Sequence, residues 1–165
     1  MTIRPAEPRD LPALLDLFER AKAFMARTGN PNQWKPGYPG AELMSGEIAR
    51  GVCYLAEEAG EPVGTFCAIP GEEPTYKVIY DGAWPEEGAY LTIHRLASNG
   101  KARGVAKACF AFCEERGLPL RIDTHGDNHV MQDLLAKNGF TYCGRILLAD
   151  GSPRLAYHRP ARQPE

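Results

Sequence analysis

Residues 91–110, LTIHRLASNGKARGVAKACF, constrain the fold more than any other stretch of the sequence. The apolar run at its start predicts a buried strand over 89–97, and Ser98–Asn99–Gly100 predicts a turn. The apolar pattern after the turn predicts a helix over 104–116. A buried strand that leads into an amphipathic helix indicates a sheet covered by helices.

Hydrophobic periodicity and turn residues predict the other elements. We expect a helix that Asp10 caps and Gly29 ends, a short helix over 41–50, and a helix over 127–139 capped by Asp127. The remaining strands are expected over 52–58, 63–69, 75–80, 118–125, 140–149 and 154–159. This order predicts one α/β (α+β) domain, residues 1–165, in which a mixed sheet carries helices on both faces.

Composition excludes several classes of function. The formal net charge is −2, so no overall basic field favours nucleic acid as a partner. No run of about 18 apolar residues is present, so no membrane span is expected. The first ten residues, MTIRPAEPRD, lack the apolar core of a signal peptide, and we therefore expect a cytoplasmic protein.

The five cysteines lie inside apolar segments, and none forms a CxxC pair. An odd number of cysteines in apolar surroundings is typical of buried thiols in a reducing compartment. Disulfides and a zinc site are not expected.

The turn after the strand is basic, with Lys101, Arg103 and Lys107 around Gly104. A helix N-terminus leaves about four backbone N–H groups without partners and favours anions. Glycine allows a ligand to approach the backbone, so the turn suits a pyrophosphate. Neither GxxxxGK[ST] nor GxGxxG is present, and an unliganded turn with solvated basic residues is the alternative.

Three motifs in register resemble the GNAT superfamily of N-acyltransferases. KARGVA (residues 101–106) resembles its [Gln/Arg]-x-x-Gly-x-[Gly/Ala] motif, and IHRLAS resembles the strand before it. The run from Asn128 to Phe140 resembles the fourth-helix signature Asn-x-x-Ala-x-x-Leu-Tyr-x-Lys-x-Gly-Phe. The resemblance spans nearly the whole chain and implies a mixed, mostly antiparallel sheet and acetyl-CoA as co-substrate.

The resemblance also implies where acetyl-CoA binds. The strands over 91–97 and 120–124 would splay, the pyrophosphate would bind the amides of 101–106, and the pantetheine arm would run beside 96–98. A backbone N–H near Leu96 would stabilise the oxyanion. The implied cofactor-binding residues are Leu96, Ala97, Ser98, Lys101, Ala102, Arg103, Gly104, Val105, Ala106 and Asn128.

Two positions depart from the family pattern. Lys101 replaces the usual glutamine or arginine, which keeps the charge but not the fork geometry of arginine. Leu135 stands where many members carry a tyrosine general acid. The implied activity is acetyl transfer from acetyl-CoA to a primary amine by direct attack. A non-catalytic acyl-CoA sensor or interaction module is the alternative.

Histidines are the candidate catalytic residues. His94 lies where related enzymes often place a glutamate, and it would remove the proton from the amine. The alternative is a structural histidine that makes its hydrogen bonds within the sheet or to a neighbouring backbone group. His125 would orient His94, relay a proton or cap its own turn. His125 and His129 form an HxxxH pair, but Gly126 breaks the shared helical face, so no metal is expected. Ser98, His94 and Asp123 lack the G-x-S-x-G elbow of a hydrolase.

The loop NPNQWKPGYPG (residues 30–40) is expected to border the acceptor. Gln33 and Trp34 are its candidate substrate-binding residues, and a hydrophobic plug is the alternative role of the indole. The acceptor is a small-molecule or peptide amine that the sequence does not identify. Edge strands in this fold also allow a homodimer.

Overall fold

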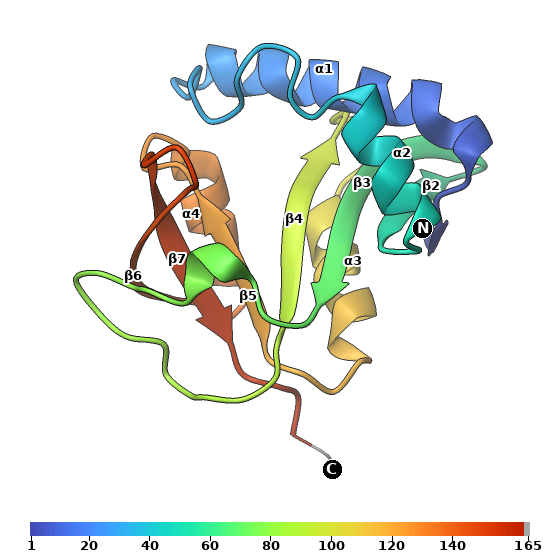
Figure 1. Cartoon of the computed structure of the whole chain (residues 1–165). Helices are drawn as coiled ribbons and strands as arrows, with labels where there is room; N and C mark the ends of the chain where they lie inside the picture. Colours follow the sequence, from blue (N-terminus) through green and yellow to red (C-terminus); the bar gives the residue numbers. More distant parts are fainter. Residues whose placement is uncertain (164–165) are drawn as a thin grey trace.

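The computed structural model describes residues 1–163, which form a mixed order of strands and helices along the chain (Figure 1). The strands are β1 (Thr2–Pro5), β2 (Cys53–Glu58), β3 (Glu61–Pro70), β4 (Leu91–Ser98), β5 (Leu120–Thr124), β6 (Thr141–Leu147) and β7 (Pro153–Arg159). The helices are α1 (Leu11–Arg27), α2 (Ala41–Ala49), α3 (Val105–Glu114) and α4 (His129–Lys137), with short 3₁₀ helices η1 (Pro8–Asp10) and η2 (Pro74–Tyr76).

The seven strands form one sheet in the order β1-β2-β3-β4-β5-β7-β6. Only the central pair, β4 and β5, is parallel, and every other pair is antiparallel. The prediction of a mixed, mostly antiparallel sheet is confirmed. The helix α3 crosses from β4 to β5, as a parallel pair requires.

Helices cover both faces of this sheet (Figure 1). Along β2, Cys53 and Leu55 join the core cluster under α1 and α2, whereas Tyr54 joins the cluster under α3 and α4. This alternation is the period of two expected of a strand buried on both faces. Among the described helices, none has the length and apolar character needed to cross a membrane.

The prediction of a strand over 75–80 is wrong. Pro74 begins the 3₁₀ helix η2 instead, and Trp84 Nε1 donates a hydrogen bond of 2.8 Å to the Tyr76 carbonyl. Only Tyr80 keeps a strand contact, an isolated bridge to Arg145. A proline ring and anchored aromatic side chains therefore override the β propensity of this segment. The strand β1 was not expected.

Of the two predicted helix caps, Asp10 is confirmed as the residue at the N-cap position of α1, and Asp127 is wrong. The Asp10 carboxylate accepts hydrogen bonds from Arg4 and from the backbone N–H of Glu7, and makes no side-chain cap to α1. At α4 the capping residue is Asn128, whose Oδ1 accepts from Met131 N at 3.0 Å. Because aspartate and asparagine both cap well, sequence alone did not distinguish the adjacent Asp127 from Asn128.

All five cysteines are buried and free, as predicted. Cys53 and Cys67 lie opposite each other on β2 and β3. Burial raises the pKa of the Cys109 thiol in the core under α3. These thiols pack as small apolar groups.

Gly64 on β3 fixes how closely the start of α3 approaches the sheet. A Cβ at this position would overlap Val105 Cγ1 and lie 3.1 Å from the Ala97 carbonyl oxygen. We predict that Gly64→Ala lowers the free energy of unfolding by about 1–3 kcal/mol through overpacking. Adding Val105→Ala should recover part of that loss, measured by urea denaturation. Purely additive losses in the double variant would contradict this packing.

Candidate functional site

The strands β4 and β5 separate in the middle of the sheet. Their register holds only two pairs, Leu91 with Leu120 and Thr92 with Arg121. Beyond these two pairs, β4 continues to Ser98 and β5 continues to Thr124, but the two strands no longer pair with each other. The splay implied by the family resemblance is therefore present. Backbone groups along the separated edges become available to a ligand.

A β-bulge lies on β4 where the strands separate. The register with β3 passes from His94 opposite Cys67 to Ala97 opposite Thr65, so two residues of β4 face one of β3. Arg95, inside the bulge, has φ of 55°, in the left-handed region that non-glycine residues rarely adopt. Bulges redirect side chains and often occur beside active sites.

Two cavities meet at this bulge. The first, here called the turn-side cavity, has a volume of about 410 Å³ and is lined by β4, the 102–107 turn and α4. The second, the loop-side cavity, has a volume of about 480 Å³ and is lined by the 33–38 loop, β4, β5 and the β6–β7 connection. Met25, Leu96 and Met131 line both. The two spaces are thus adjoining halves of one site.

The turn-side cavity presents unused hydrogen-bond donors. Across residues 1–163, the backbone N–H groups of Ala102 to Lys107 have no intramolecular acceptor. Gly104 has φ of 77°, and a Cβ there would meet no atom within 4 Å. The Lys101, Arg103 and Lys107 side chains are exposed and form no ion pair within the described residues. These donors and charges fit a pyrophosphate.

Most of the expected acetyl-CoA residues lie on this cavity. Its lining includes Leu96, Ala97, Ser98, Ala102, Gly104, Val105, Ala106 and Asn128. Lys101 and Arg103 are in the same turn but outside the lining. The side-chain amide of Asn128 already makes an internal hydrogen bond, in which Nδ2 donates to Gln33 Oε1 at 2.8 Å.

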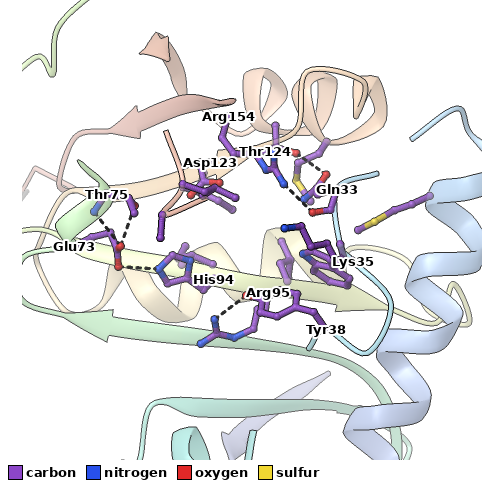
Figure 2. A pocket seen from close by; sticks show the side chains of 18 of the residues that line it. Gln33, Lys35, Tyr38, Glu73, Thr75, His94, Arg95, Asp123, Thr124 and Arg154 are labelled. Carbon is purple, nitrogen blue, oxygen red and sulfur yellow. Dashed lines mark hydrogen bonds and ion pairs between the residues drawn. The ribbon is translucent and has the colours of Figure 1, made fainter. Parts of the chain in front are cut away.

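The loop-side cavity contains a histidine–carboxylate pair (Figure 2). His94 Nε2 lies 3.3 Å from Glu73 Oε2. Glu73 Oε1 also accepts hydrogen bonds from the backbone N–H and hydroxyl of Thr75. The contact with His94 has the largest effect on Glu73, and the two donors of Thr75 add to it. Together they lower the pKa of Glu73 to about 2. The carboxylate is therefore ionised at neutral pH.

Gln33 connects the 30–40 loop to the far side of the cavity. Its Oε1 accepts hydrogen bonds from Asn128 Nδ2 at 2.8 Å and from Thr124 Oγ1 at 3.3 Å. Trp34 lines the same cavity but also packs edge-on to Phe18, with ring centroids 5.7 Å apart. The indole thus contacts both the cavity and the core.

His125 lines neither cavity. Its Nδ1 accepts a hydrogen bond of 3.0 Å from the backbone N–H of Asp127. Leu135 is fully buried in the core and also lines neither cavity. In the part of the chain that the structure describes, no group of three or more histidine, cysteine or carboxylate side chains is placed to hold a metal ion.

Comparison with known proteins identifies the family. A model of the acetyltransferase (GNAT) family matches residues 13–140. The chain belongs to the GNAT family of acetyltransferases. None of the curated proteins compared with the chain matches it.

Solved structures agree with this assignment. A GNAT acetyltransferase from Streptococcus agalactiae 2603 is 34% identical, with a TM-score of 0.87 over 98% of this chain and 96% of that one. A GNAT acetyltransferase from Listeria monocytogenes 4b F2365 (19% identical, TM-score 0.67, covering 96% and 94%) shares the fold. The NatB acetyltransferase complex bound to CoA and MES also shares the fold. Its matched chain is 13% identical, with a TM-score of 0.63 over 98% of this chain and 100% of that one. The protein is a GNAT N-acetyltransferase that uses acetyl-CoA.

Sequence patterns did not single out several charged residues of this GNAT site. Glu73 lies in an irregular segment, and Lys35 and Arg154 belong to no family motif quoted above. Arg95 lies within the IHRLAS motif but was not singled out there. Asp123 was considered only as part of a hydrolase triad. No pattern in the sequence distinguished Arg154, because the predicted closing strand RLAYHR contains a second arginine and a histidine.

The Glu73–His94 pair predicts a pH-dependent stability. Because the pKa of Glu73 falls from 4.5 to about 2 on folding, its ionised form stabilises the fold above about pH 4.5. This contribution is lost as the pH falls toward 2. Glu73→Gln should therefore be less stable than the parent at neutral pH, and the difference should shrink with acidification in urea titrations. Glu72→Gln, a neighbouring exposed carboxylate, is the control. A pH-independent difference for Glu73→Gln would contradict the prediction.

Proposed function

We propose that acetyl-CoA binds in the turn-side cavity, that the acceptor amine binds in the loop-side cavity, and that the amine attacks the thioester directly. The observation that carries this proposal is the junction of the two cavities at Leu96, on the bulge of β4. A thioester beside this bulge is open to an amine from the other half of the site. Holding both reactants at such a junction supplies the proximity that direct transfer needs.

In this proposal the chain holds acetyl-CoA with backbone groups. The unpartnered N–H groups of Ala102 to Lys107 bind the pyrophosphate, and the nearby cations add charge. The pantetheine arm lies along the β4 edge at 96–98 that β5 leaves unpaired. A backbone N–H at Leu96 stabilises the oxyanion. The fold shared with the CoA-bound NatB complex supports this placement.

His94 takes the proton from the attacking amine. The Glu73 carboxylate is ionised and can only accept a hydrogen bond, so the facing Nε2 of neutral His94 carries the hydrogen. Nδ1 is then left with the lone pair that removes the amine proton. Glu73 acts as a positioning residue that fixes this tautomer and stabilises the imidazolium.

The remaining candidates have supporting roles. His125 holds the turn before α4, and Gln33 and Trp34 form the acceptor side of the site. Leu135 supplies no acid. A free thiol has a pKa of about 8.5, so coenzyme A can leave as a thiolate and take its proton from water.

The activity is tested by coenzyme A release from acetyl-CoA in the presence of added amines, with the acetylated product identified by mass spectrometry. We expect acceptor-dependent release, and we expect His94→Ala to lower kcat about 10²-fold while acetyl-CoA affinity changes little. His125→Ala should have a smaller effect. Acetyl-CoA binding without acceptor-dependent release would instead indicate the non-catalytic sensor. Unchanged kcat and pH profile in His94→Ala would remove His94 from the base role.

The turn-side placement is tested at Gly104. Gly104→Val should weaken acetyl-CoA binding at least tenfold in calorimetry, because the side chain would project into the cradle and disfavour φ of 77°. Gly117→Val is the matched control, since Gly117 also has positive φ (72°), has open space around it and lies outside both cavities. Equal affinity in folded Gly104→Val would place the nucleotide elsewhere.

A further inference from the structure

The charges of the loop-side cavity are only partly paired. Lys35 Nζ pairs with Asp150 at 2.5 Å, Arg95 Nη2 pairs with Glu47 at 2.8 Å, and His94 pairs with Glu73. Within residues 1–163, Arg154 and Asp123 have no ionic partner. The cavity thus offers one unpaired cation and one unpaired anion.

Arg154 is an unusual residue to leave unpaired. It is only 6% exposed, and its guanidinium donates to two backbone carbonyls, Nη1 to Pro153 and Nη2 to Gln33, both at 2.8 Å. These bonds use two of its five N–H donors. A buried charge without a counter-charge is costly, and arginine is almost never fully buried unless paired. Burial lowers the pKa of Arg154, and the nearby charges of Asp123 and Asp150 offset this only in part. An anionic ligand group in the cavity would compensate this charge.

Asp123 lies on the same face of the sheet as Arg154. Asp123 is opposite Ala156 in the β5–β7 register, and Arg154 is two residues from Ala156 along β7. Such diagonal neighbours are about 7–8 Å apart, and their Cβ atoms lie somewhat closer. In Figure 2 both side chains reach the cavity from the upper part of the view, and Arg95 and Tyr38 from the lower part. One Asp123 oxygen accepts from Tyr76 at 2.7 Å, and the other has no hydrogen-bond donor among the described residues.

An unpaired cation and an unpaired anion at this spacing complement a small ligand with an amine and a carboxylate. We propose that the acceptor is a free amino acid, that Arg154 binds its carboxylate, and that Asp123 binds its ammonium group before the proton is removed. The planar guanidinium fork matches a carboxylate better than a point charge does. This proposal rests on the loop-side cavity being the acceptor site, as argued above.

The rest of the cavity suits an amino-acid side chain. Its volume of about 480 Å³ is within the range of small-molecule sites, roughly 300–1,000 Å³. Met25, Trp34 and Leu148 provide an apolar wall beside the charged groups. A peptide N-terminus has an amide in place of the α-carboxylate and would leave Arg154 unpaired. The structure therefore favours the free amino acid over a peptide amine.

The first test uses the unaltered protein. The common L-amino acids and their C-terminal amides are compared as acceptors, with coenzyme A release as the readout. We expect the preferred free acid to exceed its amide by at least about tenfold in kcat/KM, or about 1.4 kcal/mol. The amide has the larger fraction of neutral amine near neutral pH, so amine reactivity cannot produce this preference. Equal or better turnover of the amides would overturn the proposal.

The second test separates binding from turnover. Titration calorimetry with coenzyme A present measures binding of the free acids and of the amides without any acetyl transfer. Binding of an acid without turnover would uphold the carboxylate site and contradict the proposed chemistry. Turnover of other amines with no binding of any free acid would overturn the carboxylate site and leave the acetyltransferase mechanism intact. Absence of both acid binding and turnover would overturn both.

The third test removes the cation. Arg154→Met should raise KM for the preferred acid at least tenfold and leave the KM of its amide and acetyl-CoA affinity nearly unchanged. Arg154→Lys should retain part of the preference. Arg145→Met removes an exposed arginine that pairs with Asp81 and lies outside both cavities, and it should change nothing. Thermal melting accompanies each variant. A KM increase shared equally by acid and amide would assign Arg154 a structural role and overturn the proposal.

Discussion

The separation of β4 from β5 is the constraint on which the rest of the site depends. Two registered pairs join the halves of the sheet, and beyond Thr92 the two strands take different partners, β3 on one side and β7 on the other. A sheet that stayed paired would satisfy its own backbone groups and leave no edge for a ligand. The bulge at Arg95 increases the effect, because it turns β4 at the level where the two cavities meet. Tight packing of α3 over Gly64 then places the turn at 101–106, the proposed phosphate site, at the end of the same strand.

A single residue, Gln33, connects the elements around the proposed acceptor half. Gln33 Oε1 accepts from β5 through Thr124 and from the start of α4 through Asn128, and its main-chain carbonyl accepts from Arg154 on β7. The loop that closes the acceptor side is therefore attached to the elements that carry the charged residues. Networks of part-buried hydrogen bonds such as this one favour a single arrangement of the elements that they join. The exposed Lys35–Asp150 pair at the rim adds little, because solvent screens surface ion pairs.

The two halves of the site use different physical means. The proposed nucleotide half offers main-chain N–H groups and a glycine with positive φ, so recognition there would depend on backbone geometry. The acceptor half relies on side chains from segments far apart in the chain, among them Glu73, His94 and Arg154. This division fits a family with a common co-substrate. Backbone contacts place little demand on side-chain identity, whereas the acceptor half can change one side chain at a time.

The sequence by itself determined the family, the mixed sheet, most helices and strands, and the turn at 101–106. Each of these depends on local patterns, namely hydrophobic period, glycine position and a contiguous motif. It failed at 75–80, where Pro74 and the hydrogen bond from Trp84 to Tyr76 override local β propensity. Only the tertiary structure decided that Glu73 faces His94, that Leu135 is buried in the core, and that Arg154 and Asp123 lie unpaired on one face of the sheet. Those facts depend on strand register and on contacts between residues distant in the chain, and a shift of one residue in register would turn each of these strand side chains to the opposite face.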